Sequence, residues 1–182
     1  TEKIIQDATV EKGKLCYGPK KYGILFLPEV KSMFPETMAK LYEFVSKGGK
    51  IYSIGCLPEK SLGLNNYQEN DKKVSRLVEK LRAFPDRFVL ISKPDDLRYL
   101  EWYTGLQQQY RLPHYLEIGQ PDRYLMQTRY QADDKSEIFF FANAHKHEGR
   151  SSRITFSREI TNGRYPWLLD PETGRSYRLK LE

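Results

Sequence analysis

The chain has 182 residues, of which 39% are hydrophobic and 30% are charged, and its net charge is +6. This length and composition are typical of a soluble protein with one medium domain, or with one domain and a smaller appendage, and they exclude a disordered chain. No apolar run approaches the roughly 20 residues that a membrane-spanning helix needs, so we expect no membrane partner.

The excess of basic residues is spread along the sequence. Its densest group is the pair Lys20 and Lys21, and acidic residues interrupt the basic ones elsewhere. A mixed, solvated surface is therefore favoured over a nucleic-acid-binding face, and we expect no nucleic-acid partner. The sequence begins with threonine, and its first ten residues lack the basic and apolar regions of a secretory signal. We therefore expect an excised piece of a longer protein.

Strands and helices alternate over the first 112 residues. The apolar run at 22–27 predicts a strand covered on both faces, and Pro35 opens a helix whose apolar residues recur at i, i+3, i+4 and i+7 until Gly48 and Gly49 end it. Two strands and two helices are predicted to follow, the strands at 50–54 and 88–91 and the helices at 70–82 and 95–105, the last capped by Asp95 or Asp96. The alternation predicts a doubly wound α/β layer.

The pattern changes after Pro113. The remaining residues predict short strands without helices between them, at 124–130, 137–142, 152–156, 165–169 and 177–181. Pro171 and Gly174 supply the fixed and the positive φ of a turn before the last of them. We therefore predict two domains, an α/β domain at 1–112 and a smaller antiparallel β unit at 113–182.

Cys56 follows a predicted buried strand, as a catalytic thiol on a strand-to-helix turn would. Such turns need small residues two positions before and after the nucleophile, and Ile54 and Pro58 stand there instead. A reactive thiol also needs a base, and the three histidines, His114, His145 and His147, all come much later in the sequence. We interpret Cys56 as a small apolar residue at a strand end and predict no catalytic residue.

The two cysteines do not predict a metal site. Cys16 and Cys56 lack the C-x-x-C spacing of zinc ligands, and a disulfide between them would require neighbouring strands. His145 and His147 alternate as ligands at a strand end can, but their surroundings are typical of a polar loop. We expect no bound metal and no cofactor.

Four residues are candidates for a ligand edge. Glu29 and Glu59 follow the first and second buried strands, at the carboxyl edge where α/β sheets bind ligands. Trp102 on the third helix and Trp167 near the end of the sequence could stack on sugar rings. The alternative for the glutamates is an ordinary solvated loop. The alternative for Trp102 is packing, because Tyr99, Trp102 and Tyr103 form one helical stripe.

The order of these segments resembles a known family. Residues 22–30, 34–41, 45–51 and 55–58 resemble the accessory domain of large glycoside hydrolases of the α-L-rhamnosidase type, family 106. The same layout occurs in the amidotransferase-like domain of family 42 β-galactosidases. Residues 137–143 and 167–174 are similar to the β segment that follows in the rhamnosidase group.

The resemblance implies a flavodoxin-like three-layer domain of the class I glutamine amidotransferase kind that has lost its catalytic elbow, followed by the β unit. It further implies that the parent's catalytic carboxylates lie in a barrel upstream, that the remaining domains and carbohydrate are the partners, and that the protein is periplasmic or secreted. The main hypothesis is a non-catalytic accessory region of a larger glycoside hydrolase. The alternatives are an amidotransferase-like or peptidase-like enzyme that uses Cys56, and a stand-alone carbohydrate-binding module.

Overall fold

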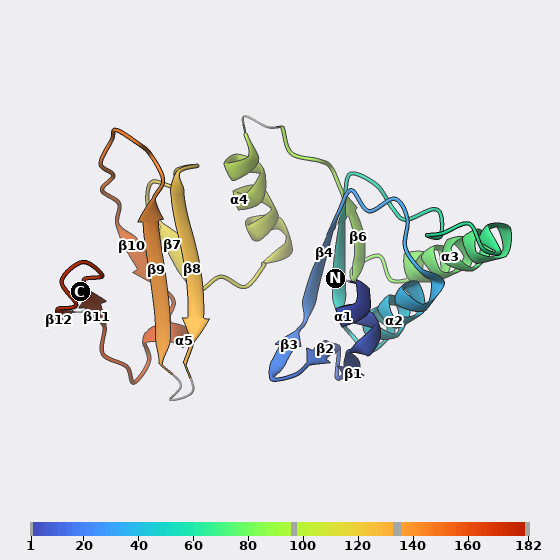
Figure 1. Ribbon diagram of the computed structural model, residues 1–182, viewed down its shortest axis with the longest axis horizontal. Coiled ribbons are helices and arrows are strands. Elements are labelled where there is room, and N and C mark those ends of the chain that lie inside the picture. Colours follow the sequence, from blue (N-terminus) through green and yellow to red (C-terminus); the bar gives the residue numbers. More distant parts are fainter. Residues whose placement is uncertain (1, 96–97, 133–135, 181–182) are drawn as a thin grey trace. The chain divides into compact units, whose positions relative to one another are not determined.

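The computed structural model describes residues 2–95, 98–132 and 136–180. It is a mixed α/β protein with five helices and twelve strands in these ranges (Figure 1). None of the described helices is both long and apolar enough to span a membrane. The chain divides into two compact units, Thr1–Lys93 and Pro94–Glu182. The division falls before the boundary expected after Leu112, so the assignment of residues 94–112 to the first domain stays a prediction.

A three-stranded parallel sheet forms the centre of the first unit, in the order β4-β5-β6. Its strands are β4 (Ile24–Pro28), β5 (Lys50–Ile54) and β6 (Phe88–Ile91), joined by the helices α2 (Pro35–Ser46) and α3 (Tyr67–Arg82). The strands expected at 50–54 and 88–91 are confirmed to the residue. The strand expected at 22–27 is instead divided, because Tyr22 ends the preceding antiparallel strand and β4 begins at Ile24.

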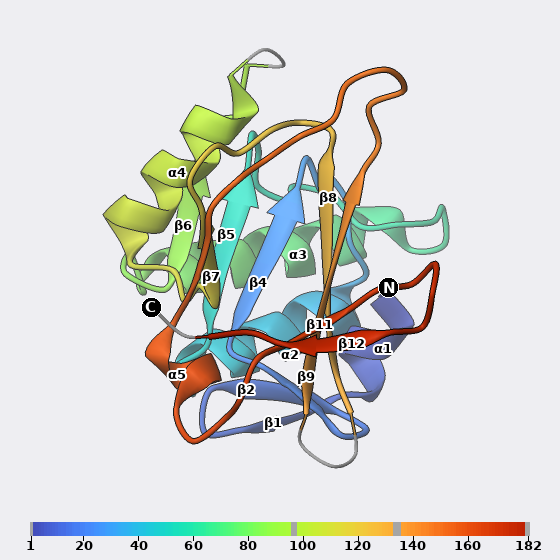
Figure 2. The same cartoon turned by 90° about the vertical axis from the view of Figure 1, so that its left-hand side faces the viewer.

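Both crossover helices lie on the same face of this sheet (Figures 1 and 2). They pack against each other and bury a common apolar core, whose fully buried members are Met38, Leu41, Phe44, Val45, Ile51, Val74 and Leu81. Gly49 is required at the end of α2, because a Cβ there would collide with the ring of Phe44. One helical layer and the sheet are present within this unit, so the third layer of a flavodoxin-like domain stays a prediction.

Of the N-terminal elements of the first unit, only a strand or strand end at Cys16 was predicted from the sequence. They are a helix and a three-stranded antiparallel sheet: α1 (Glu2–Asp7), β1 (Thr9–Glu11), β2 (Lys14–Tyr17) and β3 (Lys20–Tyr22). Gln6 of α1 donates a hydrogen bond to the hydroxyl of Thr37 on α2, at 2.8 Å. Cys16 lies in β2 and Cys56 follows β5, in different sheets, and both are free thiols.

The second unit contains two helices and three two-stranded antiparallel sheets among the described residues. The sheets pair β7 (Leu116–Ile118) with β10 (Ile154–Phe156), β8 (Leu125–Gln131) with β9 (Glu137–Asn143), and β11 (Trp167–Leu169) with β12 (Ser176–Arg178). Each of the five expected strands overlaps one of these, whereas β7 was not predicted. The short helix α5 (Arg158–Thr161) was not predicted either.

Helix α4 (Tyr99–Tyr110) differs from its prediction at both ends. It continues through Gly105 for five more residues, so the expected end near Gly105 is wrong. A glycine inside a helix costs about 1 kcal/mol and is tolerated where the rest of the helix is favourable. Arg98 stands at the N-terminal cap and no side chain caps the helix there, which rules out Asp95 as the cap. Asp96 lies outside the described residues.

Candidate functional site

The carboxyl edge of the parallel sheet gathers residues from three loops. The register aligns Pro28 with Ile54 and Ile54 with Ile91, so the residues that follow the three strands meet at one edge. The backbone N–H of Glu29 donates to the carbonyl of Ile54, and the N–H of Gly55 donates to that of Ile91, both at 2.9 Å. Glu29 thus lies at the carboxyl edge of the sheet, where its position in the sequence predicts it.

At this edge Glu29 forms an ion pair with Lys93. The lysine Nζ lies 3.3 Å from Oε1 and 3.2 Å from Oε2 of the carboxylate, and each side chain is more than half exposed. Gly55 lies beside both side chains of the pair, because a Cβ at this position would contact each of them. An exposed pair contributes about 0–1 kcal/mol to stability, so its main effect is to present one anion and one cation side by side to solvent.

Glu59 belongs to the loop after β5, which pairs with the loop after β4. Ser32 and Lys60 form a parallel bridge, and the N–H of Glu59 donates to the carbonyl of Lys31 at 3.0 Å. The Glu59 side chain is exposed. Within the described residues, the carboxylate of Glu29 pairs with Lys93 and makes no hydrogen bond with that of Glu59. The role of both residues as ligand contacts stays a prediction.

The surroundings of Cys56 are those of a structural residue. The Ser53 hydroxyl donates to the carbonyl of Cys56 at 2.6 Å, and this holds the turn. The positive φ of the turn, 79°, belongs to Gly55, and the next helix, α3, begins only at Tyr67. All three histidines fall in the second compact unit. The first unit thus holds no imidazole that could deprotonate this thiol.

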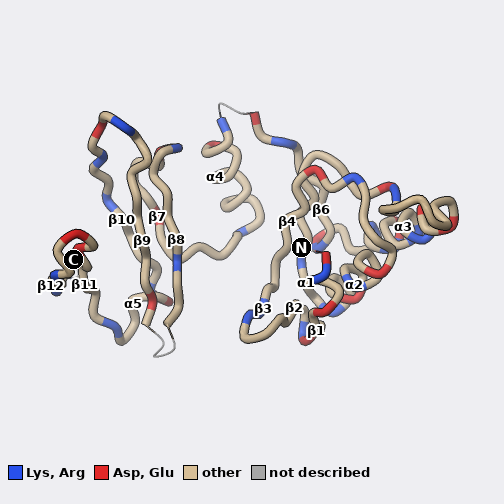
Figure 3. The backbone as a smooth tube through the Cα atoms, in the orientation of Figure 1, with Lys and Arg blue, Asp and Glu red and all other residues tan. Residues whose placement is uncertain are grey.

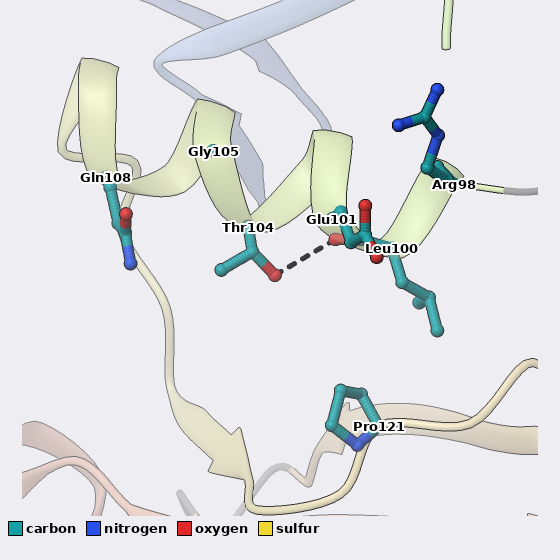
Figure 4. Close-up of a pocket in the computed structure, with 7 residues that line it drawn as sticks. All are labelled: Arg98, Leu100, Glu101, Thr104, Gly105, Gln108 and Pro121. Atoms are coloured by element: carbon teal, nitrogen blue, oxygen red, sulfur yellow. Dashed lines mark hydrogen bonds between the residues drawn. The ribbon is translucent and has the colours of Figure 1, made fainter. Parts of the chain in front are cut away.

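A shallow groove along α4 is a second candidate site, and it was not predicted from the sequence. It has a volume of about 540 Å³ and is lined by Arg98, Leu100, Glu101, Thr104, Gly105, Gln108 and Pro121 (Figure 4). The Thr104 hydroxyl already donates to the carbonyl of Leu100 at 2.9 Å. Along the helix, the groove therefore offers a ligand mainly the carboxylate of Glu101 and the amide of Gln108 for hydrogen bonding. Their spacing was visible in the sequence, but an exposed polar stripe is also the ordinary solvent face of a helix.

The two candidate tryptophans lie on different elements. Trp102 is half-buried on α4 and does not line the groove, and Trp167 is exposed on β11 opposite Arg178. Neither is surrounded by a described cavity. Their role as sugar-stacking residues therefore stays a prediction.

His145 has a local structural role. Its Nδ1 accepts a hydrogen bond from the backbone N–H of Glu148 at 3.0 Å, and its ring packs edge-on against Tyr124.

Across 2–95, 98–132 and 136–180, no group of three or more His, Cys, Asp and Glu residues is arranged to hold a metal ion. Charged residues of both signs are interspersed along the backbone (Figure 3).

The family follows from a comparison of the whole chain. The family model described as α-L-rhamnosidase, glycoside hydrolase family 106, matches residues 1–182. The chain belongs to this family. The resemblance stated from the sequence motifs is thus confirmed at the level of the rhamnosidase family, and with it the relation to carbohydrate-acting hydrolases.

A curated relative of the chain is named after a different substrate. It is a protein of Formosa agariphila named "Putative beta-glucuronidase", 27% identical over 180 residues. The match covers 93% of the chain but 13% of that protein, so the chain spans about an eighth of the relative's length. No solved structure matches the chain significantly.

Proposed function

We propose that the chain is a non-catalytic accessory region of a larger glycoside hydrolase of the rhamnosidase family. The observation that carries the proposal is the carboxyl edge of the β4-β5-β6 sheet. The place where an α/β domain would hold its reactive groups has a thiol with no histidine in its unit and a glutamate already paired with Lys93. The family match over all 182 residues supplies the hydrolase context.

In this proposal the first unit derives from a flavodoxin-like domain of the glutamine amidotransferase kind. Its support is the β4-α2-β5-α3-β6 succession and the glycine with positive φ at the end of β5. The catalytic carboxylates then belong to a barrel in the longer polypeptide, and the remaining domains are the partners of the chain. The small share of the Formosa agariphila relative that the chain covers supports this arrangement.

The proposal is tested by assaying the isolated 182 residues and the longer polypeptide that contains them. Aryl α-L-rhamnosides and aryl β-glucuronides are suitable substrates, given the names of the family and the relative. We expect turnover by the longer polypeptide and none by the isolated chain. Turnover by the isolated chain that Glu29→Gln or Glu59→Gln abolishes would overturn the proposal.

Carbohydrate binding is a second candidate function, and the groove on α4 favours it. A carboxylate, an amide and a guanidinium line one open concavity (Figure 4), and such groups recognise sugar hydroxyls by hydrogen bonds. Titration calorimetry with rhamnose-containing oligosaccharides tests it. We expect binding that weakens in Glu101→Ala and Gln108→Ala, and binding unaffected by both variants would exclude the groove.

A further inference from the structure

The β8–β9 hairpin of the second unit has two unlike faces. Its strands pair in register from Leu125 opposite Asn143 to Gln131 opposite Glu137. Because side chains alternate between the two faces of a strand, this register assigns every residue of the hairpin to one face or the other. Arg129, Phe139 and Glu137 share one face with Leu125, Gln127, Gln131, Phe141 and Asn143.

The face that carries Arg129 is packed within its own unit. The guanidinium of Arg129 lies 3.7 Å from the centre of the Tyr115 ring and donates two hydrogen bonds to Glu137, whose side chain is only 5% exposed. The ring of Phe139 meets that of Phe156 on β10 at 5.0 Å between centres. These contacts fix which face of the hairpin points into the unit, so the other face points away from them.

The opposite face, which we name the apolar hairpin face, consists of Met126, Thr128, Tyr130, Ile138, Phe140 and Ala142. Its four large side chains are exposed by 62% (Met126), 62% (Tyr130), 41% (Ile138) and 55% (Phe140). None of the six residues is charged, in a chain with 30% charged residues. A contiguous exposed apolar face without charges is typical of the core of an interface, and it is uncommon on a free surface.

The strand pairing of the hairpin supports the same conclusion. Among the described residues β8 and β9 form a sheet of two strands with no third strand at either edge. A two-stranded sheet is marginally stable in water unless a further layer covers its apolar face. The Arg129 face already has such a layer in Tyr115 and Phe156, and burial of Tyr130 and Phe140 on the other face would add further apolar contact area.

We propose that the apolar hairpin face docks against an apolar surface of the same polypeptide outside residues 1–182. The inference rests on the proposed function, in which the chain is part of a larger hydrolase, and the relative of which the chain covers 13% shows how much polypeptide such a protein can hold. A sugar platform fits this face less well. Sugar sites place several polar hydrogen-bonding groups beside their aromatic rings, whereas here the hydroxyls of Thr128 and Tyr130 are the polar side-chain groups and Met126 and Ile138 lie among the rings.

Cysteine accessibility tests the docking. Thr128 lies in the middle of the apolar hairpin face and is itself exposed, so Thr128→Cys introduces a thiol there without removing a buried group. Lys146→Cys, in the exposed loop after β9, is the matched control. The rate of maleimide labelling is measured by mass spectrometry of the peptide that carries each position, in the isolated chain and in the longer polypeptide. We expect labelling of Thr128→Cys to be at least about tenfold slower in the longer polypeptide, with no change at Lys146→Cys.

Four results would overturn the proposal. The first is equal labelling of both variants in the longer polypeptide. The second is protection of Thr128→Cys in the isolated chain that grows with protein concentration, which assigns the face to a second copy. The third is slow labelling of Thr128→Cys in the isolated chain at every protein concentration. The fourth is a slowing of its labelling in the isolated chain when oligosaccharide is added. The glycosidase assay on the isolated chain tests the accessory role separately, so the failure of either idea is recognised without the other.

Discussion

Arg129 and Glu137 lie diagonally across β8 and β9, and the arginine donates from Nε and Nη2 to the two carboxylate oxygens at 2.8 and 2.9 Å. Hydrogen bonding to Glu137 raises the pKa of Arg129 above its ordinary value, against the opposing effect of burial. The same carboxylate lies 3.8 Å from Arg164. A buried anion with two cationic neighbours is stable only while they stay in place.

Removing Arg129 should therefore destabilise the protein. We expect Arg129→Ala to lower the free energy of unfolding by about 2–4 kcal/mol, because it leaves the buried carboxylate of Glu137 without its bidentate partner. Urea denaturation of the isolated chain measures the effect. Lys93→Ala is the matched control, since it breaks an exposed pair and should cost about 1 kcal/mol or less. Equal losses in the two variants would contradict the distinction between them.

Two glycines should respond to alanine with opposite signs. Gly55 has a φ of 79°, which an alanine rarely adopts, so Gly55→Ala should destabilise by about 1–3 kcal/mol. Gly105 lies inside α4, and a Cβ added there would meet nothing within 4 Å beyond the helix itself, so Gly105→Ala should stabilise by about 0.5–1 kcal/mol. Thermal unfolding of both variants checks the pair. A stabilising Gly55→Ala would show that the turn after β5 is not held as described.

The loop that carries Glu59 should loosen at acidic pH. Oδ1 of Asp71 accepts hydrogen bonds from the N–H and the hydroxyl of Ser61, both at 2.7 Å, and these bonds lower the pKa of the carboxyl below 3.8. Because the pKa is lowered in the folded state, the stabilisation is fully present above 3.8 and is lost as the pH falls through the folded pKa.

Hydrogen exchange of the Ser61 amide, followed from pH 5 to pH 3, measures this loss after correction for intrinsic exchange rates. Asp71→Ala should show at pH 7 the weak protection that the native chain shows only below pH 3.8. Asp86→Ala removes an exposed carboxylate elsewhere in the unit and should leave the Ser61 amide unchanged. Protection of the Ser61 amide that persists in Asp71→Ala at pH 7 would contradict the prediction.

The thiol after β5 should be dispensable for hydrolysis. We expect Cys56→Ser to change kcat/KM of the longer polypeptide by less than about twofold, as for the control Cys16→Ser, because the unit that holds both thiols contains no histidine to deprotonate them. Steady-state kinetics on an aryl glycoside measures both. A loss of about a hundredfold or more in Cys56→Ser alone would favour the Cys56-dependent enzyme instead.

The central sheet was predictable because its signals are local. The apolar runs at 50–54 and 88–91 and the glycine stop after α2 specify their elements without help from distant residues. The pairing of the N-terminal sheet was missed because its strands are only three or four residues long and two of them contain lysine. The end of α4 was placed too early because Gly105 was given more weight than the residues that continue the helix.

The site was predictable only in part. The rule for α/β sheets places Glu29 at the carboxyl edge, but nothing near it in the sequence identifies Lys93 as its partner. The burial of Glu137 was equally hidden, because a glutamate at a strand end is usually exposed and its cationic partners, Arg129 and Arg164, come from other parts of the sequence. Such contacts depend on tertiary packing, which hydrophobic periodicity does not encode.

The pairing of Glu29 with Lys93 also bears on the order of folding. The two residues are 64 positions apart, and both crossover helices and β5 lie between them in the sequence. Contacts of such long sequence separation form late, because the entropy of closing the intervening loops must be overcome first. We therefore expect the carboxyl edge of the sheet to form late in folding, and any function that depends on it to require the whole β4-α2-β5-α3-β6 unit.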